Sequence, residues 1–128
     1  MKRVLILEND ADLLYIMQEA LYYEGFHVTC ITEVSDIFHL VDTYKPDLLM
    51  IDYLLPGTDG GELCKRLKKN SATRHLPVII NSVYPRRQMS LGINDCDDFI
   101  AKPFDLDDMV NRIKKLLDKK KRPDIRVI

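Results

Sequence analysis

Three apolar runs of this chain are each followed by a side chain that could take part in phosphoryl chemistry. A carboxylate, a hydroxyl and an amine follow the runs at 48–51, 76–80 and 99–101, and they belong to Asp52, Ser82 and Lys102. The carboxylate can act as a nucleophile, while the hydroxyl and the ammonium can hydrogen-bond and neutralise phosphoryl oxygens. Each alone has an ordinary structural explanation, such as a helix cap or a surface lysine. Together they predict a phosphoryl site, provided that the fold brings them together.

A further polar set follows the first apolar run, at 4–7. Glu8, Asn9 and Asp10 bring carboxylate and amide oxygens, which are the ligands that Mg²⁺ prefers in proteins. If this loop lies beside Asp52, the sequence predicts a hard divalent cation next to the phosphoryl group.

The run at 48–51 predicts the strand around which the domain is organised. Its four residues are all apolar, which is the pattern of a strand covered on both faces in a parallel sheet. Asp52 closes this strand. Pro56, Gly57 and Gly60 then turn the chain. The carboxylate is therefore expected at the carboxyl end of a central strand, the edge at which open α/β sheets bind ligands.

The rest of the chain alternates strand patterns with helix patterns. Strands are expected at 4–7, 27–31, 48–51, 76–80 and 99–101, and helices within 13–21, 37–44, 59–67 and 106–117. Gly25 is placed to end the first helix, and Pro123 to stop the last. Asp59 and Asp105 are placed to cap the third helix and the last. The segment 84–95 has a weak pattern, so any helix there is expected to be short or loosely held.

This alternation predicts an α/β fold, a three-layer sandwich with a five-stranded parallel sheet. In such a fold the polar residues that follow the strands meet at one edge. Asn81, in front of Ser82, is expected only to find a local hydrogen bond. The basic residues of the third helix are expected to face water, and they are Lys65, Arg66, Lys68 and Lys69.

Length and composition fit one ordinary domain. The chain has 128 residues, of which 46% are hydrophobic and 30% charged, and its net charge is -1. Because the chain has no excess of basic residues, its charge does not indicate nucleic acid or an anionic membrane as a partner. Three widely spaced cysteines match neither a disulfide framework nor a zinc site. No apolar run reaches the roughly 20 residues that span a bilayer. We therefore expect a protein of the reducing cytoplasm with no membrane partner.

Three segments of the chain resemble a known family. The family is the receiver domains of two-component response regulators. Its phosphoacceptor loop resembles DLLMIDYLLPGTDG, its switch-hydroxyl strand resembles PVIINSV, and its lysine-proline strand end resembles DDFIAKPFDLDDM. The three segments stand in the same order in this chain as in the family. The resemblance spans nearly the whole chain. It implies the doubly wound, flavodoxin-like fold of CheY-like receivers. The receiver is expected at 1–121, with a C-terminal tail or the start of a linker at 122–128.

The resemblance also implies roles for individual residues. By this resemblance Asp52 is expected to be phosphorylated from a histidine kinase or a phosphotransfer protein. The domain is then expected to be a regulatory phosphoacceptor with at most weak self-dephosphorylation, not an enzyme. Lys102 contacts the phosphoryl group, Ser82 is the switch hydroxyl and Phe99 stands at the switch aromatic position. The resemblance implies that the surface from the fourth strand to the last helix is the one that would bind an effector or a second copy. The Mg²⁺ ligands are Glu8, Asn9, Asp52 and the backbone carbonyl of Leu54.

The sequence departs from the family pattern at several positions. Asn9 stands where a second acidic residue, the one closest to the metal, is usual. An amide brings an oxygen but no charge, so Mg²⁺ is expected to bind weakly, with Asp10 compensating in part. Val83 is bulkier than the small residue usual after the switch hydroxyl, and Asp95 stands where Gly is common. The stretch between the fourth and fifth strands also looks shorter than usual.

Two other functions stay open. A degenerate receiver would bind partners without being phosphorylated, and Asn9 favours it. A true enzyme on a similar sheet, such as a phosphatase or a flavin protein, is disfavoured by two features. Leu54 replaces the aspartate that haloacid-type phosphatases use two positions after the nucleophile, and no Gly-rich phosphate loop follows the first strand.

Overall fold

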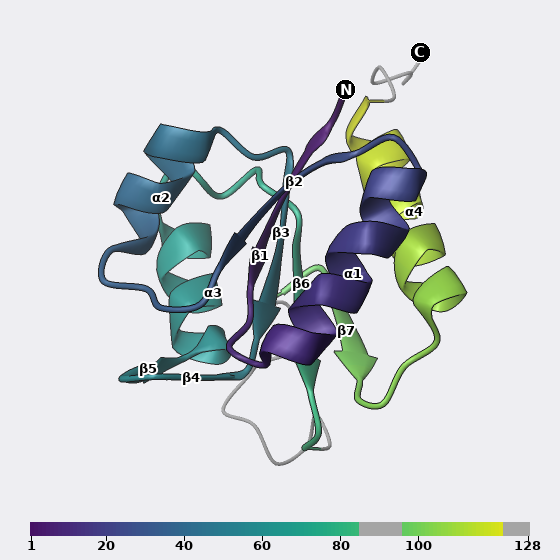
Figure 1. Ribbon diagram of the computed structural model, residues 1–128. Helices are drawn as coiled ribbons and strands as arrows, with labels where there is room; N and C mark the ends of the chain where they lie inside the picture. The colour runs from purple at the N-terminus through teal and green to yellow at the C-terminus, as the bar shows by residue number, and fades with distance from the viewer. Residues whose placement is uncertain (85–95, 122–128) are drawn as a thin grey trace.

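The computed structural model describes residues 1–84 and 96–121. Within them the chain forms a five-stranded parallel sheet in the order β2-β1-β3-β6-β7, as Figure 1 shows. The strands are β1 Arg3–Leu7, β2 His27–Ile31, β3 Leu48–Asp52, β6 Val78–Ser82 and β7 Asp98–Ala101. All four neighbouring pairs run parallel. The predicted five-stranded parallel sheet is confirmed.

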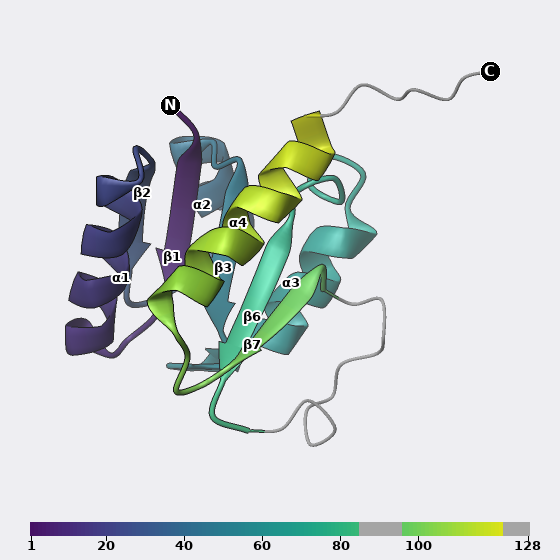
Figure 2. The same cartoon turned by 90° about the vertical axis from the view of Figure 1, so that its right-hand side faces the viewer.

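Four helices of the described residues cover the two faces of this sheet. They are α1 Ala11–Tyr23, α2 Ile37–Tyr44, α3 Gly60–Lys69 and α4 Leu106–Lys121. Helices α1 and α4 lie on one face, and α2 and α3 lie on the other (Figures 1 and 2). The arrangement is a three-layer, doubly wound, flavodoxin-like sandwich, as predicted.

Side chains alternate between the two faces along each strand, and this alternation decides where the polar residues go. Leu48, Met50 and Ile79 belong to the core under α1 and α4, whereas Leu49 and Ile80 belong to the core under α2 and α3. Every residue of β3 is buried, which explains why its run is apolar throughout. Because successive side chains point to opposite faces, four polar residues continue rows of the first core. They are Glu8 after Ile6, Asp52 after Met50, Asn81 after Ile79 and Lys102 after Ile100.

Each of the four helices in the described residues begins at an aspartate that accepts hydrogen bonds from its first turn, and at α2 this is Asp36, whose Oδ1 accepts from the Phe38 backbone N at 3.0 Å. Asp59 Oδ1 accepts from the Glu62 backbone N at 2.8 Å, and Asp105 Oδ1 accepts from the Asp107 backbone N at 2.8 Å, so both predicted caps are confirmed. Asp10 caps α1, a role that the sequence analysis missed.

Gly25 has φ +88 after α1, as its predicted place at the helix end requires.

A small hairpin, which the sequence analysis did not predict, follows β3. Strand β4 (Leu54–Leu55) pairs antiparallel with β5 (Thr58–Asp59). Gly60 then returns the chain to the end of β3, where its backbone N donates to the Tyr53 carbonyl at 2.7 Å. A Cβ at Gly60 would lie 2.6 Å from the Asp52 carbonyl oxygen, so only glycine permits this close approach. The hairpin is thereby held against the carboxyl end of the central strand.

Some boundaries and contacts differ from the predictions. Strand β6 begins at Val78 and continues through Ser82, because the ladder with β3 and β7 extends past the apolar residues. Lys68 does not simply face water. Its ammonium contacts Asp97 Oδ2 at 2.6 Å and the Leu76 carbonyl at 2.7 Å, and its side chain is 21% exposed. The expectation for this lysine was wrong because its stem reaches back over the loop before β6.

Two predictions fall on residues that the structure does not describe. The weak helix expected at 84–95 lies almost wholly within 85–95, and Pro123 lies within 122–128. Among residues 1–84 and 96–121, no helix combines the length and the apolar character that a membrane crossing requires.

Candidate functional site

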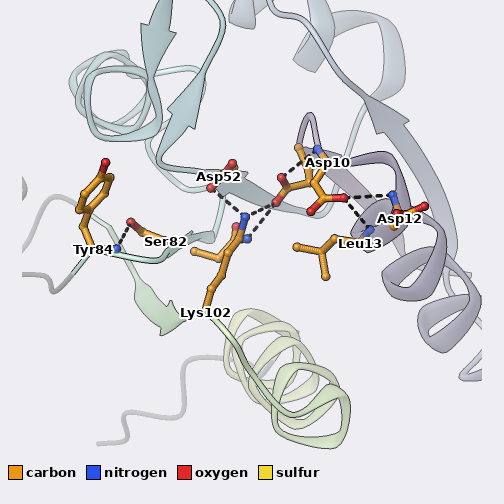
Figure 3. A network of polar contacts seen from close by, with 9 residues as sticks. Asp10, Asp12, Leu13, Asp52, Ser82, Tyr84 and Lys102 are labelled. Atoms are coloured by element: carbon orange, nitrogen blue, oxygen red, sulfur yellow. Dashed lines mark hydrogen bonds and ion pairs between the residues drawn. The ribbon is translucent and has the colours of Figure 1, made fainter.

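The polar residues that follow the strands line one cleft at the carboxyl edge of the sheet (Figure 3). The cleft has a volume of about 460 Å³. It is lined by Glu8, Asn9, Asp10, Asp52, Leu54, Leu55, Pro56, Ser82, Val83 and Lys102. The structure therefore brings together six of the seven predicted site residues, and Phe99 is the exception.

Glu8 is the most buried charge of this cleft, with 1% of its surface exposed. Its Oε1 accepts from Lys102 Nζ at 2.8 Å and from Asn81 Nδ2 at 3.2 Å. Its Oε2 accepts from the Asp10 backbone N at 3.2 Å. A buried carboxylate is costly unless it is paired and hydrogen-bonded, and these three donors satisfy that condition.

Lys102 joins the two carboxylates. Its ammonium lies 2.8 Å from Glu8 Oε1 and 3.2 Å from Asp52 Oδ1, and its side chain is 15% exposed. A single cation thus separates two anions that would otherwise repel each other across the cleft. It comes from the loop after β7, whereas the anions come from the ends of β1 and β3.

The surroundings of Asp52 weaken its acidity. Burial and then the negative charge of Glu8 raise the pKa of Asp52 from 3.8 to about 6, against the lowering effect of Lys102. The carboxylate is therefore mostly ionised at neutral pH but becomes protonated in mild acid. An ionised carboxylate in a cleft, facing an ammonium, is a competent nucleophile.

Ser82 lies on the opposite wall of the cleft. Its position continues the row of Val78 and Ile80, so its side chain leaves the sheet on the face opposite to that of Asp52. Its hydroxyl accepts from the Tyr84 backbone N at 2.9 Å. Figure 3 shows this bond well apart from the contact between Lys102 and Asp52.

Leu54, Val83 and Phe99 differ in how far they are exposed to solvent. Leu54, in the hairpin, is 49% exposed, and Val83, behind Ser82, is 65% exposed. Phe99 is partly buried against the core under α2 and α3.

Asn81 is a site residue that the sequence analysis misjudged. A local hydrogen bond was expected, but the amide donates to Glu8, 73 residues away. Asn81 sits opposite Asp52 in the sheet register and is only 1% exposed. The available signal was an amide directly after an apolar strand run, because a buried polar side chain needs a partner.

The oxygen ligands of the cleft are of the type that a hard cation takes, but they carry less negative charge than two acidic residues after the first strand would give. Glu8 and Asp52 supply carboxylate oxygens and Asn9 an amide, which are the ligand types that Mg²⁺ takes. Asp10 is partly engaged, since its Oδ1 accepts from the first turn of α1. Over residues 1–84 and 96–121, no group of three or more His, Cys, Asp or Glu side chains is arranged to hold a metal ion.

The fold and the site together define a doubly wound α/β domain with an acidic, lysine-bridged cleft at its ligand-binding edge. The family model of the response regulator receiver domain matches residues 4–114. The chain therefore belongs to the response regulator receiver domain family.

Relatives of known sequence are transcriptional regulators. The phosphate regulon transcriptional regulatory protein PhoB of Rhizobium meliloti is 29% identical, over 96% of this chain and 55% of its own length. The protein of the same name from Pseudomonas aeruginosa is 30% identical, over 91% of this chain and 52% of its own length. The chain thus spans about half the length of the curated relatives it matches.

Solved structures support the same fold. A putative response regulator from Chloroflexus aurantiacus has a TM-score of 0.82 and 28% identity, covering 91% of this chain and 98% of its own. The receiver domain of a histidine kinase from Syntrophus aciditrophicus has a TM-score of 0.86 and 25% identity, covering 100% of this chain and 98% of its own. The response regulator protein TrrA from Thermotoga maritima, solved with Mg²⁺ and BeF, has a TM-score of 0.80 and 22% identity, covering 91% of this chain and 99% of its own.

Proposed function

We propose that this chain is a phosphoacceptor receiver domain that takes a phosphoryl group on Asp52 from a histidine kinase or a phosphotransfer protein. The observation that carries the proposal is the contact of Asp52 with Lys102, 3.2 Å long, inside the cleft at the carboxyl edge of the sheet. Such a pair offers a nucleophile and a cation to the same phosphoryl group.

The transfer itself needs little more than position and charge. An ionised oxygen of Asp52 attacks the phosphorus of the donor phosphohistidine, the P–N bond breaks, and the imidazole nitrogen keeps the electron pair. Lys102 then moves its contact from the carboxylate to the phosphoryl oxygens. Glu8 keeps the ammonium in the cleft throughout.

Bound Mg²⁺ would neutralise part of the phosphoryl charge in this site. The residues that would hold it are Glu8, Asn9, Asp52 and the backbone carbonyl of Leu54. Asn9 reduces the negative charge of this set, so binding is expected to be weak.

Phosphorylation is proposed to shift an equilibrium between two arrangements of the wall opposite Asp52. The phosphoryl group attracts the Ser82 hydroxyl away from the Tyr84 backbone N, and this movement changes the space open to Phe99. The surface from β6 through β7 to α4 then binds an effector or a second copy of the chain. We expect no enzymatic activity beyond weak self-dephosphorylation.

The direct test is labelling with acetyl phosphate or a cognate kinase. Asp52→Asn should abolish the label, because the amide cannot form an acyl phosphate. Asp59→Asn is a matched control, since it changes a nearby carboxylate to an amide that still caps α3. Wild-type levels of label in Asp52→Asn would refute the assignment.

A degenerate receiver, which binds partners without phosphorylation, is the second candidate. Asn9 and the engagement of Glu8 by three donors favour it, because both disfavour a cation. Beryllofluoride binding with Mg²⁺ separates the two candidates. Binding supports the phosphoacceptor, and no binding at saturating Mg²⁺ supports the degenerate receiver.

The extent of the domain and its surroundings are also proposals. We place the receiver at 1–121 and regard 122–128 as a tail or the start of a linker. The relatives include transcriptional regulators about twice as long as the matched region, among them the DNA-binding regulator RpaA of Synechocystis, of which the match covers 49%. We propose that this domain acts in the cytoplasm and controls a partner without itself contacting nucleic acid.

A further inference from the structure

Asn81 is a buried amide in a strand of the sheet, where most of the other buried side chains are apolar. It lies in β6 between Asp52 of β3 and Ile100 of β7, and 1% of its surface is exposed. A buried amide without a partner would be destabilising at such a position. Its partner is Glu8, whose Oε1 lies 3.2 Å from the Asn81 Nδ2. The contact with Glu8 is therefore the reason that an amide is tolerated in this strand.

The donors around Glu8 leave little room for a cation. Oε1 accepts from both Asn81 and Lys102, which uses both lone pairs of that oxygen. Oε2 accepts from the backbone N of Asp10, which leaves one lone pair as far as residues 1–84 and 96–121 are concerned. A cation that uses Glu8 must therefore take this last position or displace a donor.

The three donors differ in how easily they can leave. Lys102 has a flexible stem and a second partner in Asp52. The backbone N of Asp10 is fixed where α1 begins. Asn81 sits in a central strand and would be buried without this partner if the contact broke. Asn81 is thus a firmly held neutral donor, and its removal changes Glu8 without changing the charge of the site.

We propose that Asn81 is a positioning residue that holds Glu8 Oε1 in its pair with Lys102 and thereby keeps the Mg²⁺ affinity of the unphosphorylated site low. The inference rests on the proposed function, because the cation is the one that assists phosphorylation of Asp52. When Lys102 turns to the phosphoryl group, Oε1 regains a lone pair and the cation binds better. Asn9 and Asn81 act in the same direction, so the cation is retained mainly while the phosphoryl group is present.

Calorimetric titration of the whole chain with Mg²⁺ tests this role through the variant Asn81→Leu. Loss of the amide frees a lone pair of Glu8, so Mg²⁺ affinity should rise roughly three- to tenfold, the range expected for one hydrogen bond. The midpoint of urea unfolding without Mg²⁺ should fall, because Glu8 loses a partner. A residue with a purely structural role would lower both quantities. Unchanged or weaker Mg²⁺ binding overturns the proposal.

Thr73→Val is the matched control, because it also removes a buried hydrogen bond, from Thr73 Oγ1 to the Leu67 carbonyl at 2.7 Å, outside the cleft. It should lower the unfolding midpoint and leave Mg²⁺ affinity unchanged. Asn81→Val provides a smaller, β-branched replacement with the same expected direction if leucine is not accommodated. Acetyl phosphate labelling of the wild type is measured in parallel. Absence of label refutes the proposed function, whereas intact labelling with no rise in Mg²⁺ affinity refutes only the role of Asn81.

Discussion

The two walls of the cleft differ in how firmly their polar side chains are held. On one wall Glu8, Asp52 and Lys102 form a buried network that links the ends of β1, β3 and β7. On the other wall the buried Ser82 hydroxyl accepts from the backbone N of Tyr84, a neighbour in the chain, and within the described residues it makes no ion pair, while Val83 is exposed. Fully satisfied buried networks resist rearrangement, while segments with few buried contacts move first. From this comparison we expect the charged wall to stay fixed if Asp52 is phosphorylated as proposed, and the wall with the Ser82 hydroxyl to be the part that moves.

Lys102→Met should weaken the charged wall most. It leaves Glu8 and Asp52 facing each other without their shared cation, so the free energy of unfolding at pH 7 should fall by about 3 kcal/mol, the usual effect of breaking a buried ion pair. Urea denaturation measures this loss. Lys45→Met is the control, because its contact with Asp42 is exposed and should contribute under about 1 kcal/mol. Equal losses in the two variants would show that the wall is not a coupled network.

A smaller effect is expected from the charge of Asp52 itself. The pKa of this group is raised in the folded protein to about 6, so the folded state binds a proton more tightly than the unfolded chain does. Stability contributed by the protonated form is therefore present below pH 4 and lost as the pH rises to 6. Asp52→Asn, which cannot ionise, should exceed the wild type in unfolding free energy by about 1–2 kcal/mol at pH 7.5.

This advantage of Asp52→Asn should shrink towards zero near pH 4. Urea denaturation at pH 4, 5, 6 and 7.5 follows the difference between the two proteins. A difference that is constant across this range, or a variant less stable at pH 7.5, would contradict the raised pKa and its origin in burial and Glu8.

Asn9→Asp tests the charged wall by adding a negative charge beside Glu8. A further carboxylate next to Glu8 should strengthen Mg²⁺ binding by about tenfold, because the affinity of a hard-cation site follows its count of charged ligands. The unfolding midpoint without Mg²⁺ should fall slightly through repulsion between the carboxylates. Calorimetry and urea denaturation measure the two effects. Equal or weaker Mg²⁺ affinity in the variant would sink this explanation of the departure from the family pattern.

The sequence predicted the fold well because its signals are local or periodic. The apolar run at 48–51 required a strand buried on both faces, and Asp59 and Asp105 capped the helices that follow them. The hairpin after β3 was not predicted, because strands of two residues are too short to show an alternation of apolar and polar residues.

The site was predicted less completely, since its contacts depend on packing. Strand alternation could have placed Ser82 on the face opposite to that of Asp52, but only the sheet register shows that Asn81 reaches Glu8. The double role of Asp10, as the cap of α1 and as a backbone donor to Glu8, depends on the loop conformation and has no signature in composition.

Amide hydrogen exchange with and without beryllofluoride and Mg²⁺ tests the contrast between the two walls most directly. With the mimic bound to Asp52, protection should change between residues 82 and 104, whereas β1 and β3 should keep theirs. Ser82→Ala should still bind the mimic but lose most of this change, because the hydroxyl couples the phosphoryl group to its wall. Unchanged protection between 82 and 104, with the mimic demonstrably bound, would contradict the switch and leave the domain a fixed scaffold.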